Sequence, residues 1–191
     1  CTNPKSYSNL SEGNHTFQVK AIDEAGNTGN STYYSWTIDI TNPITNISSG
    51  PANRTDSQSV TFEFNSNELN STFQCRMDSG SWSNCTTPKS YSNLSEGNHT
   101  FYARSIDIAG NMGNFSSYNW QIDITGPIAN ITSYPYQLTN NQSATFYFDS
   151  NELNSTFQCK MDNNGWNNCT SPKSYNNLSE GNHTFYVIST D

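Results

Sequence analysis

The sequence repeats itself with a period of 84 residues. The phrase KSYSNLSEGNHTF stands at residues 5–17, again without change at 89–101, and once more at 173–185 with Asn176 replacing one serine. The flanking text keeps the same spacing, with no insertion or deletion. A period of 84 exceeds the units of helical solenoids and approaches the length of a small β-sandwich. Each repeat is therefore expected to be a domain with its own core.

Short runs in which apolar and polar residues alternate divide each repeat. In the middle repeat these runs are Val60–Phe64, Phe73–Met77, Phe101–Ala103 and Trp120–Ile124, with Ile124 expected on the buried face. Alternation with period two indicates strands that have one buried and one wet face, and clusters of Gly, Asn, Asp and Pro separate them. No stretch keeps helical spacing for long. About seven short strands per repeat predict an all-β antiparallel sandwich of two sheets.

The text FQCRMDSGSWSNCTTPKSYSNLSEGNHTFYARSIDIAGN at residues 73–111 carries a resemblance to a known family. It resembles the Ig-like repeats that occur in tandem in large prokaryotic surface and secreted proteins. The order Tyr-x-x-Leu-x-x-Gly-x-x-x-Phe, which begins at Tyr91, is similar to the corner before the sixth strand of immunoglobulin- and fibronectin-type sandwiches. There a tyrosine hydroxyl bonds to upstream backbone. The resemblance implies tandem Ig-like domains but no single function, because such units extend some proteins and mediate adhesion in others.

The prolines of ITNP and ITGP suggest where one repeat passes into the next. Residues 42–125 are then one complete Ig-like repeat. Residues 1–41 are the C-terminal part of a repeat, and residues 126–191 are a repeat that lacks its last strand. The sequence is therefore expected to be part of a longer array. The junctions contain two or three turn residues and a proline but no Gly/Ser linker, so the repeats should have little freedom to swing.

The five cysteines follow the repeat. Cys75 with Cys85, and Cys159 with Cys169, form two Cys-x9-Cys pairs, while Cys1 aligns with Cys85 and would pair with a residue upstream of the printed sequence. The alternative for Cys1 is a free thiol or metal ligand, but no Cys-x-x-Cys or histidine cluster accompanies it. Disulfides predict an extracellular location, at the cell surface or secreted. Each ten-residue loop would stabilise its domain by roughly 2.5–3 kcal/mol.

Asparagine is abundant and stands in sixteen Asn-x-Ser/Thr triplets whose middle residue is not proline. The asparagines are Asn9, Asn14, Asn30, Asn46, Asn53, Asn70, Asn84, Asn93, Asn98, Asn114, Asn130, Asn141, Asn154, Asn168, Asn177 and Asn182. These triplets are acceptors for covalent N-glycans, which would cover the surface with hydrophilic chains. The alternative is that asparagine simply replaces charged residues as surface and turn filler.

Composition excludes some classes of partner. Eight Lys and Arg are scattered along a chain of formal charge −8, which disfavours nucleic acid because phosphate binding needs clustered cations. No apolar run in the printed sequence is long enough to span a bilayer, and the residues printed predict no signal peptide among them. The expected partners are copies of the chain or neighbouring repeats in a filament, or a ligand on a cell surface.

Catalysis is not expected, because the same residues recur in each repeat and no repeat is set apart by dissimilar catalytic groups. His15, His99 and His183 occupy one position of the repeat and are expected to be structural. No metal site is assigned. The aspartates near the junctions could share calcium, although ordinary turn residues are the default. They are Asp39 and Asp123 at the junctions themselves, and Asp23 and Asp107 at the end of the preceding strand.

The tryptophans allow two interpretations. Trp82 and Trp166 precede a cysteine by three residues and are expected to cover the disulfide, while Trp36 and Trp120 are expected in the core. The alternative is an aromatic platform for sugars. Together these observations predict a structural extracellular stalk or filament of rigid, disulfide-stapled, N-glycosylated Ig-like repeats. The alternative is an adhesin module that binds through the variable loops 48–59 and 132–143.

Overall fold

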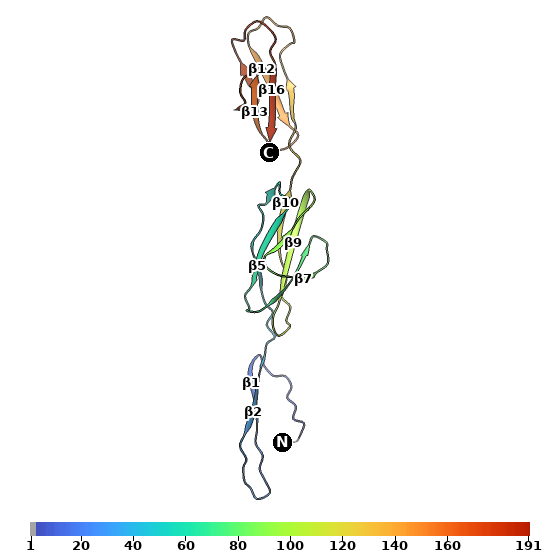
Figure 1. Cartoon of the computed structure of the whole chain (residues 1–191), viewed down its shortest axis with the longest axis vertical. Coiled ribbons are helices and arrows are strands. Elements are labelled where there is room, and N and C mark those ends of the chain that lie inside the picture. Colours follow the sequence, from blue (N-terminus) through green and yellow to red (C-terminus); the bar gives the residue numbers. More distant parts are fainter. Residues whose placement is uncertain (1–2) are drawn as a thin grey trace. The chain divides into compact units, whose positions relative to one another are not determined.

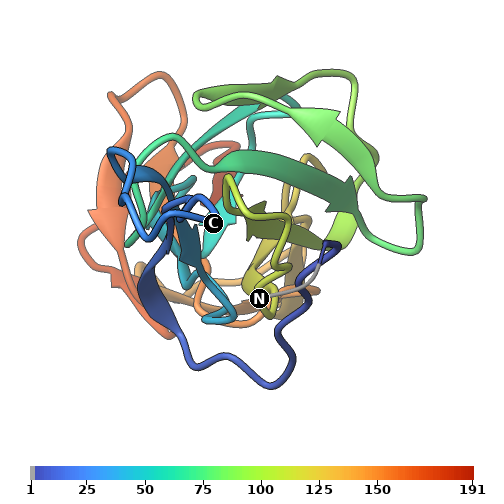
Figure 2. The same ribbon diagram turned by 90° about the horizontal axis from the view of Figure 1, so that it is seen from below.

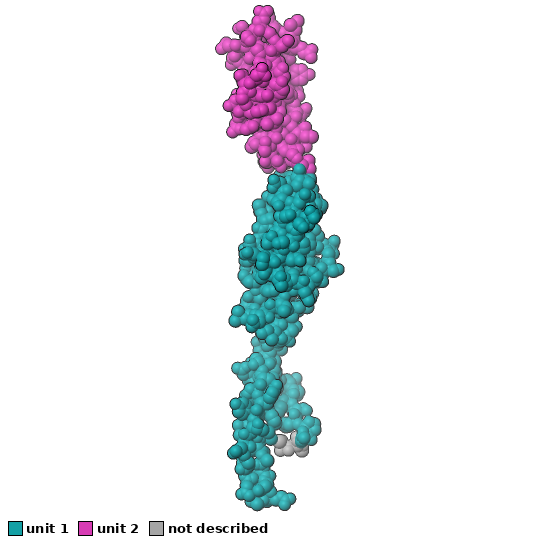
Figure 3. Space-filling view, viewed as in Figure 1, with its two compact units in different colours: residues 1–124 teal, residues 125–191 magenta. Residues whose placement is uncertain are grey.

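A computed structural model describes residues 3–191, which form strands and loops without a helix (Figures 1 and 2). Accordingly, none of these residues belongs to a helix that could cross a membrane. The chain divides into two compact units (Figure 3). Unit 1 runs to Ile124, and unit 2 is Thr125–Asp191. Cys1 lies outside the described residues.

The strands are short and fall in the alternating runs. In unit 1 they are β1 (Gly13–Val19), β2 (Thr32–Ile38), β3 (Thr45–Ser49), β4 (Arg54–Thr55), β5 (Val60–Ser66), β6 (Thr72–Met77), β7 (Ser83–Cys85), β8 (Lys89–Tyr91), β9 (Gly97–Ile106) and β10 (Ser116–Ile122). In unit 2 they are β11 (Ala129–Ser133), β12 (Ala144–Ser150), β13 (Thr156–Met161), β14 (Asn167–Cys169), β15 (Lys173–Tyr175) and β16 (Phe185–Thr190).

Unit 1 contains one hairpin and two facing sheets. The hairpin is β1-β2, and the sheets have the orders β3-β5-β8 and β4-β10-β9-β6-β7. All neighbours are antiparallel except β4, which pairs in parallel with the end of β10. The arrangement is an Ig-like sandwich, as the sequence predicted. The two-residue strand β4 was not expected, because two residues are too few to show alternation.

The core of unit 1 lies between its two sheets. It consists of the inward-facing residues Val60, Phe62, Phe64, Cys75, Phe101, Ala103, Trp120 and Ile122. Phe62 stacks on Phe101 with 4.1 Å between ring centroids, and Trp120 contacts the same Phe62 at 5.2 Å. These aromatic contacts bury large apolar areas in a chain that has few aliphatic residues, and they supply much of the stabilisation of the fold.

Two details differ from the expectation. Ile124 is 50% exposed, because β10 ends at Ile122 and the alternation of the sheet no longer applies beyond that residue. Tyr91 lies at the end of β8 and packs edge-on against Phe62 and Phe101. Within the described chain it contributes this ring contact, and no hydrogen bond from its hydroxyl to upstream backbone is found.

Unit 2 repeats the unit 1 sandwich: β11 to β15 have the bounds of β3 and β5 to β8 shifted by 84 residues, and β16 is a shorter counterpart of β9. Its sheets have the orders β11-β12-β15 and β14-β13-β16. The stacked pair Phe146–Phe185, with centroids 4.2 Å apart, reproduces Phe62–Phe101. Even the register shift in β11, between Ile131 and Ser133, recurs at the same place as in β3. The 84-residue repeat of the sequence is therefore also a repeat of structure.

Candidate functional site

The segment that joins β2 to β3 is fixed by contacts inside unit 1. Pro43 in this segment is fully buried. Its carbonyl oxygen lies against Gly113, where an added Cβ atom would come within 2.0 Å of it. Only glycine can occupy position 113 without displacing the backbone. This contact explains why a proline and a glycine recur with the repeat.

Hydrogen bonds hold both sides of the same segment. The side-chain amide of Asn111 donates to the carbonyl of Asp39 at 3.0 Å, and the Ile44 amide donates to Oδ1 of Asn67 at 2.6 Å. In unit 2 the Ile128 amide donates to Oδ1 of Asn151 in the same way, at 2.5 Å. Backbone groups that would be free in a flexible linker are thus satisfied by the sandwich.

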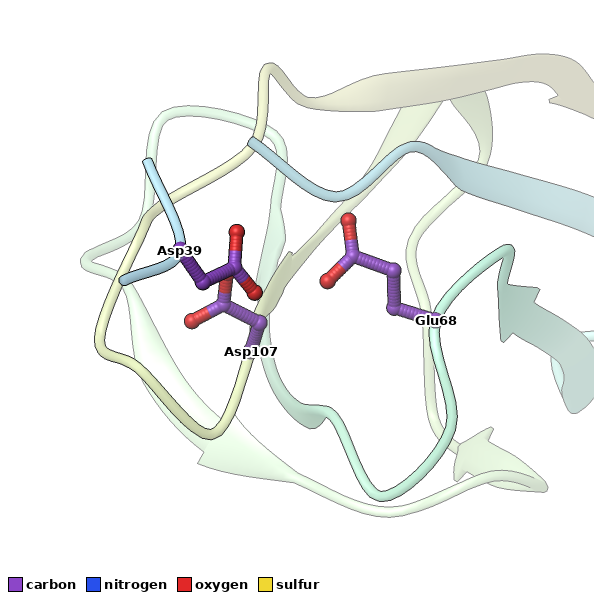
Figure 4. A group of neighbouring side chains, drawn as sticks. All are labelled: Asp39, Glu68 and Asp107. Atoms are coloured by element: carbon purple, nitrogen blue, oxygen red, sulfur yellow. The ribbon is translucent and has the colours of Figure 1, made fainter. Parts of the chain in front are cut away.

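Three carboxylates gather beside this segment: those of Asp39, Glu68 and Asp107. They come from the turns after β2, β5 and β9, and they face one another in Figure 4. One oxygen atom of each lies within 4.8 Å of the others. The sequence identified the two aspartates but missed the glutamate. The signal for it was the turn NSNELN at 65–70, which recurs as DSNELN at 149–154.

The electrostatics of this cluster are unfavourable for Glu68. Desolvation raises the pKa of its carboxyl, and the negative charges of Asp39 and Asp107 raise it further. Burial alone would also raise the pKa of Asp107, but hydrogen bonds from Asn111 and from the Gly110 amide outweigh it and lower the pKa. Asp107 is therefore a turn-forming carboxylate. Glu68 is the carboxylate whose ionised form is disfavoured by burial and by the neighbouring negative charges.

The carboxylates are chemically suited to a hard divalent cation, but much of their bonding capacity serves the turns. Oδ1 of Asp107 accepts the amides of Gly110 and Asn111 at 2.7 and 2.8 Å, and Oδ1 of Asp39 accepts the Thr41 amide at 3.1 Å. Calcium takes six to eight oxygen ligands. The default expectation, ordinary turn residues, is the one that these bonds favour.

The other two aspartates near the junctions also bond to groups outside this cluster. Asp123 forms an ion pair of 2.9 Å with Arg54. Asp23 accepts hydrogen bonds of 2.8 Å from the backbone and side chain of Asn27, at the tip of the β1-β2 hairpin. The structure thus brings Asp39 and Asp107 together and leaves Asp23 in a turn of its own.

The histidines have structural roles, as predicted. His99 is buried, and its ring nitrogens lie 2.9 Å from Oδ2 of Asp78 and 2.8 Å from the carbonyl of Ser95. Burial lowers the pKa of His99, but the two hydrogen-bond partners more than offset this, and the net shift is upward. For His183 the bond to Asp162 is the largest cause, and the pKa is likewise raised.

The cysteines form two disulfides. Cys75 bonds to Cys85 and Cys159 to Cys169, and each bridge ties two adjacent antiparallel strands together. Cys75 and Cys159 are almost fully buried in the cores of their units. Disulfides persist in oxidising compartments, so both bridges fit an extracellular domain.

All sixteen asparagines of the Asn-x-Ser/Thr triplets are exposed. Five of them have positive φ, between 55° and 66°: Asn9, Asn70, Asn93, Asn154 and Asn177. Asparagine tolerates this left-handed conformation better than most residues. At these five turns the positive φ is a structural reason for asparagine that is independent of any glycan. All sixteen asparagines are nevertheless exposed and therefore accessible as glycan acceptors.

Trp82 lies on the outer face of the second sheet, where it is half-buried and contacts two guanidinium groups. Arg104 lies 4.4 Å and Arg76 5.0 Å from the centroid of its ring. Cation–π contacts of this kind stabilise the exposed face of the sheet. In unit 2 Ile188 stands at the position of Arg104, and Trp166 is 40% exposed.

Comparison with known proteins gives structural matches alone. No family model matches the chain, and no curated protein does. Among solved structures, the FN1–FN3 domains of chicken CNTN1 match at 8% identity and a TM-score of 0.41, over 93% of this chain and 70% of that one.

Two other solved structures also match. A tetra-tandem repeat from the extending region of a large adhesion protein has 18% identity and a TM-score of 0.34, over 96% of this chain and 49% of that one. Dimeric latent PorU from Porphyromonas gingivalis has 16% identity and a TM-score of 0.35, over 98% and 21%. The chain thus spans half or less of these two proteins, and the Ig-like assignment rests on its own strand order.

Proposed function

We propose that this chain belongs to an extracellular stalk or filament whose function is to extend away from a surface. The observation that supports this most directly is the segment from Asp39 to Thr45, whose proline is buried and whose backbone is bonded on both sides by the sandwich. A repeat that emerges from such a segment has little freedom to swing. A series of many such repeats transmits tension and holds a terminal domain away from a surface.

The proposal includes two chemical features. Disulfides stabilise each small core against unfolding outside the cell. N-glycans on the sixteen exposed asparagines would shield strand edges from proteases and from pairing with other chains. No catalysis, nucleic acid or bound cofactor enters the mechanism; the partners are neighbouring repeats.

Limited proteolysis of the chain with a broad-specificity protease tests the role of the joining segment. The loop at 20–31 between β1 and β2 is exposed throughout and serves as the internal control. We expect cleavage within 20–31 first, and residues 39–45 to survive until unit 1 unfolds. First cleavage within 39–45 would show a flexible linker and contradict the stalk.

Adhesion is the second candidate, favoured by the loop at 132–143. Tyr136 and Leu138 in this loop are 89% and 93% exposed, more than a spacer needs. A glycan array probed with the full chain separates the two functions. A stalk predicts no preference among sugars, whereas a ligand whose binding is lost in Tyr136→Ser would establish the adhesin.

Intact-glycopeptide mass spectrometry of native material tests the chemical features together. We expect glycan on several of the sixteen asparagines and both disulfides intact. Unmodified asparagines with reduced thiols would contradict an extracellular glycoprotein.

A further inference from the structure

The outer face of the second sheet of unit 1 carries a group of aromatic rings. The ring of Trp82 lies 6.2 Å from that of Phe115 and 6.5 Å from that of Tyr102, measured between centroids. Phe115 is 55% exposed and Trp82 is half-buried. These rings and the strands beside them, β6, β7, β9 and β10, all lie within one full period of the repeat, residues 42–125. Large aromatic side chains on an otherwise polar face indicate a surface that makes a contact.

Asn84, one of the sixteen asparagines in Asn-x-Ser/Thr triplets, lies on the same outer face. Trp82 immediately precedes β7 and Asn84 is the central residue of this strand, so their side chains have the same direction. The side-chain amide of Gln74 donates to Oδ1 of Asn84 at 3.3 Å, which engages the oxygen of the Asn84 amide. Among residues 3–191 no hydrogen bond is found from Nδ2 of Asn84, the atom to which an N-glycan is attached.

Hydrogen bonds connect Asn84 to the surroundings of the Trp82 ring. Oε1 of Gln74 accepts hydrogen bonds from Nε and Nη2 of Arg104 at 3.0 and 2.7 Å. The Cζ atom of Arg104 lies 4.4 Å from the centroid of the Trp82 ring. A sugar attached to Asn84 would therefore find an amide and a guanidinium for its hydroxyl groups, and beside them an indole for its C–H face.

Unit 2 repeats the essential parts of this arrangement. Trp166 and Asn168 have the same spacing around the disulfide, and Gln158 donates to Oδ1 of Asn168 at 3.2 Å. Ile188 stands where unit 1 has Arg104, so the guanidinium is the part that differs. The asparagine, the glutamine that bonds its oxygen and the tryptophan are common to both units.

Spacing in the sequence is not enough to produce the arrangement. Tyr91 also precedes a triplet asparagine, Asn93, by two residues. Its ring, however, packs against Phe62 and Phe101 in the core, and Asn93 lies in a turn with a φ of 57°. Asn93 is therefore a control within the same unit: a triplet whose neighbouring aromatic ring faces away from any glycan.

We propose that Asn84 and Asn168 carry N-glycans whose first sugars pack against Trp82 and Trp166. The covalent step uses a glycosyl phosphate donor: the Nδ2–C1 bond forms, the C1–O bond breaks, the phosphate leaves with the bonding electrons, and Nδ2 loses one proton to solvent. The packed sugar covers exposed indole surface with its own hydroxyl groups, so the glycan becomes part of the folded sheet face. The inference rests on the proposed function, because it requires an N-glycosylated chain.

The test uses the full chain secreted by a eukaryotic cell line that attaches N-glycans through N-acetylglucosamine. A glycan amidase is added to the folded chain, and glycopeptide mass spectrometry follows release at each asparagine separately. We expect release at Asn84 to be at least about threefold faster in Trp82→Leu than in the wild type, because the ring contact is lost. Release at Asn93 and at Asn168 should change by less than about twofold, since neither contacts this ring.

Two variants separate the ring contact from a general loosening of the sheet. Trp166→Leu should accelerate release at Asn168 alone. Arg76→Lys introduces the residue that unit 2 has at the same position and leaves the Trp82 ring in place, so release at Asn84 should stay within about twofold of the wild type. Acceleration by Arg76→Lys as large as that by Trp82→Leu would show that the tryptophan only holds the sheet together, and would overturn the proposal.

Thermal unfolding tests whether the contact is stabilising. Thr86→Ala removes the triplet and its glycan but keeps Asn84 and the bond from Gln74. We expect Thr86→Ala to lower the Tm of unit 1 by about 2–6 °C when Trp82 is present and by less than about 1 °C in Trp82→Leu. Equal losses in both backgrounds would show that glycan and ring are not coupled, which would overturn the contact.

The outcomes separate this proposal from the proposed function. Slow release at Asn84 that persists in Trp82→Leu would place the sugar elsewhere, as in the hollow of about 460 Å³ that Phe73, Thr72 and Thr86 line beside Asn84, and would overturn the ring contact. Asn84 without glycan in a chain modified at other asparagines would overturn it too, and would leave the glycoprotein intact. A chain modified at none of its asparagines would contradict the glycoprotein itself.

Discussion

Individual polar side chains determine the turns of this molecule. Asp107 binds the amides of Gly110 and Asn111, Asp23 binds Asn27 in the corresponding turn, and asparagines supply residues with positive φ. Short polar side chains do this because they bond to nearby backbone and tolerate the left-handed region. The abundance of asparagine thus has a local structural cause in addition to any glycan that it carries.

At neutral pH, Glu68→Gln should stabilise unit 1. The folded-state pKa of Glu68 is raised, so the folded state binds its proton more tightly than the unfolded chain and is disfavoured once the carboxyl ionises. Thermal unfolding should show a higher Tm for the variant at pH 7, and the difference should vanish as the pH falls through the folded-state pKa. A lower Tm at pH 7 would show that the charge is needed.

The same variant decides the calcium question. If a calcium ion neutralised the cluster of Asp39, Glu68 and Asp107, millimolar calcium would raise the Tm of the wild type and much less that of Glu68→Gln. We expect no such difference, because the aspartates already bond to turn amides. Magnesium at the same concentration controls for ionic strength.

The histidines should make stability decline as the pH rises. The folded-state pKa values of His99 and His183 are raised, so their stabilisation is complete below the unfolded-state pKa and is lost as pH rises through the folded-state pKa. The double variant Asp78→Asn, Asp162→Asn should flatten the dependence of Tm between about pH 5.5 and about pH 8. Asp56→Asn, which removes a charge elsewhere, should leave the slope unchanged.

At the scale of strands, the alternating pattern predicted the core residues correctly but did not predict where the strands end. Val60, Phe62 and Phe64 are buried as expected, because a strand of a sandwich must present alternate residues to the core. Ile124 continues the pattern in the sequence but lies past the last ladder bond. Periodicity carries no information about where pairing stops, and it could not reveal the two-residue strand β4.

The candidate site was only partly predictable for a similar reason. The sequence indicated that junction aspartates matter, but which turns meet in space depends on strand order, so Glu68 was missed. The sequence also did not indicate that the ring of Trp82 contacts Arg76 and Arg104. Its contacts come from three different strands and turns, which no local spacing encodes.

Gly113→Ala should destabilise unit 1 by about 1–3 kcal/mol, since the new methyl group overlaps the Pro43 carbonyl and one backbone must move. Chemical denaturation measures the loss. Gly126→Ala is the matched control, because an added Cβ atom there meets nothing within 4 Å. Equal, small effects of the two substitutions would show that the contact with Pro43 is not tight.

Replacing both Cys75 and Cys85 with serine should lower the free energy of unfolding of unit 1 by roughly 2.5–3 kcal/mol. The closed loop has a sequence separation of 10, and the bridge acts by restricting the unfolded chain. Urea denaturation gives the value. The corresponding change at Cys159 and Cys169 should affect unit 2 and leave unit 1 unchanged, and a loss shared by both units would contradict independent cores.

At the scale of the whole molecule, the account depends on repeats that follow one another without a free linker. The ten residues of β9 extend for about 33 Å, and turns at both ends add a few ångströms. Each repeat should therefore advance a stalk by about 35–40 Å. Regular growth of this kind requires both a firm junction and a separate core in each repeat.

Small-angle X-ray scattering tests this claim most directly. The samples are the 191-residue chain and versions lengthened by one, two and three further copies of residues 42–125. The account predicts that the maximum dimension rises linearly, by about 35–40 Å per added copy. A dimension that levels off, or that grows only with about the square root of the number of copies as in a flexible chain, would contradict it.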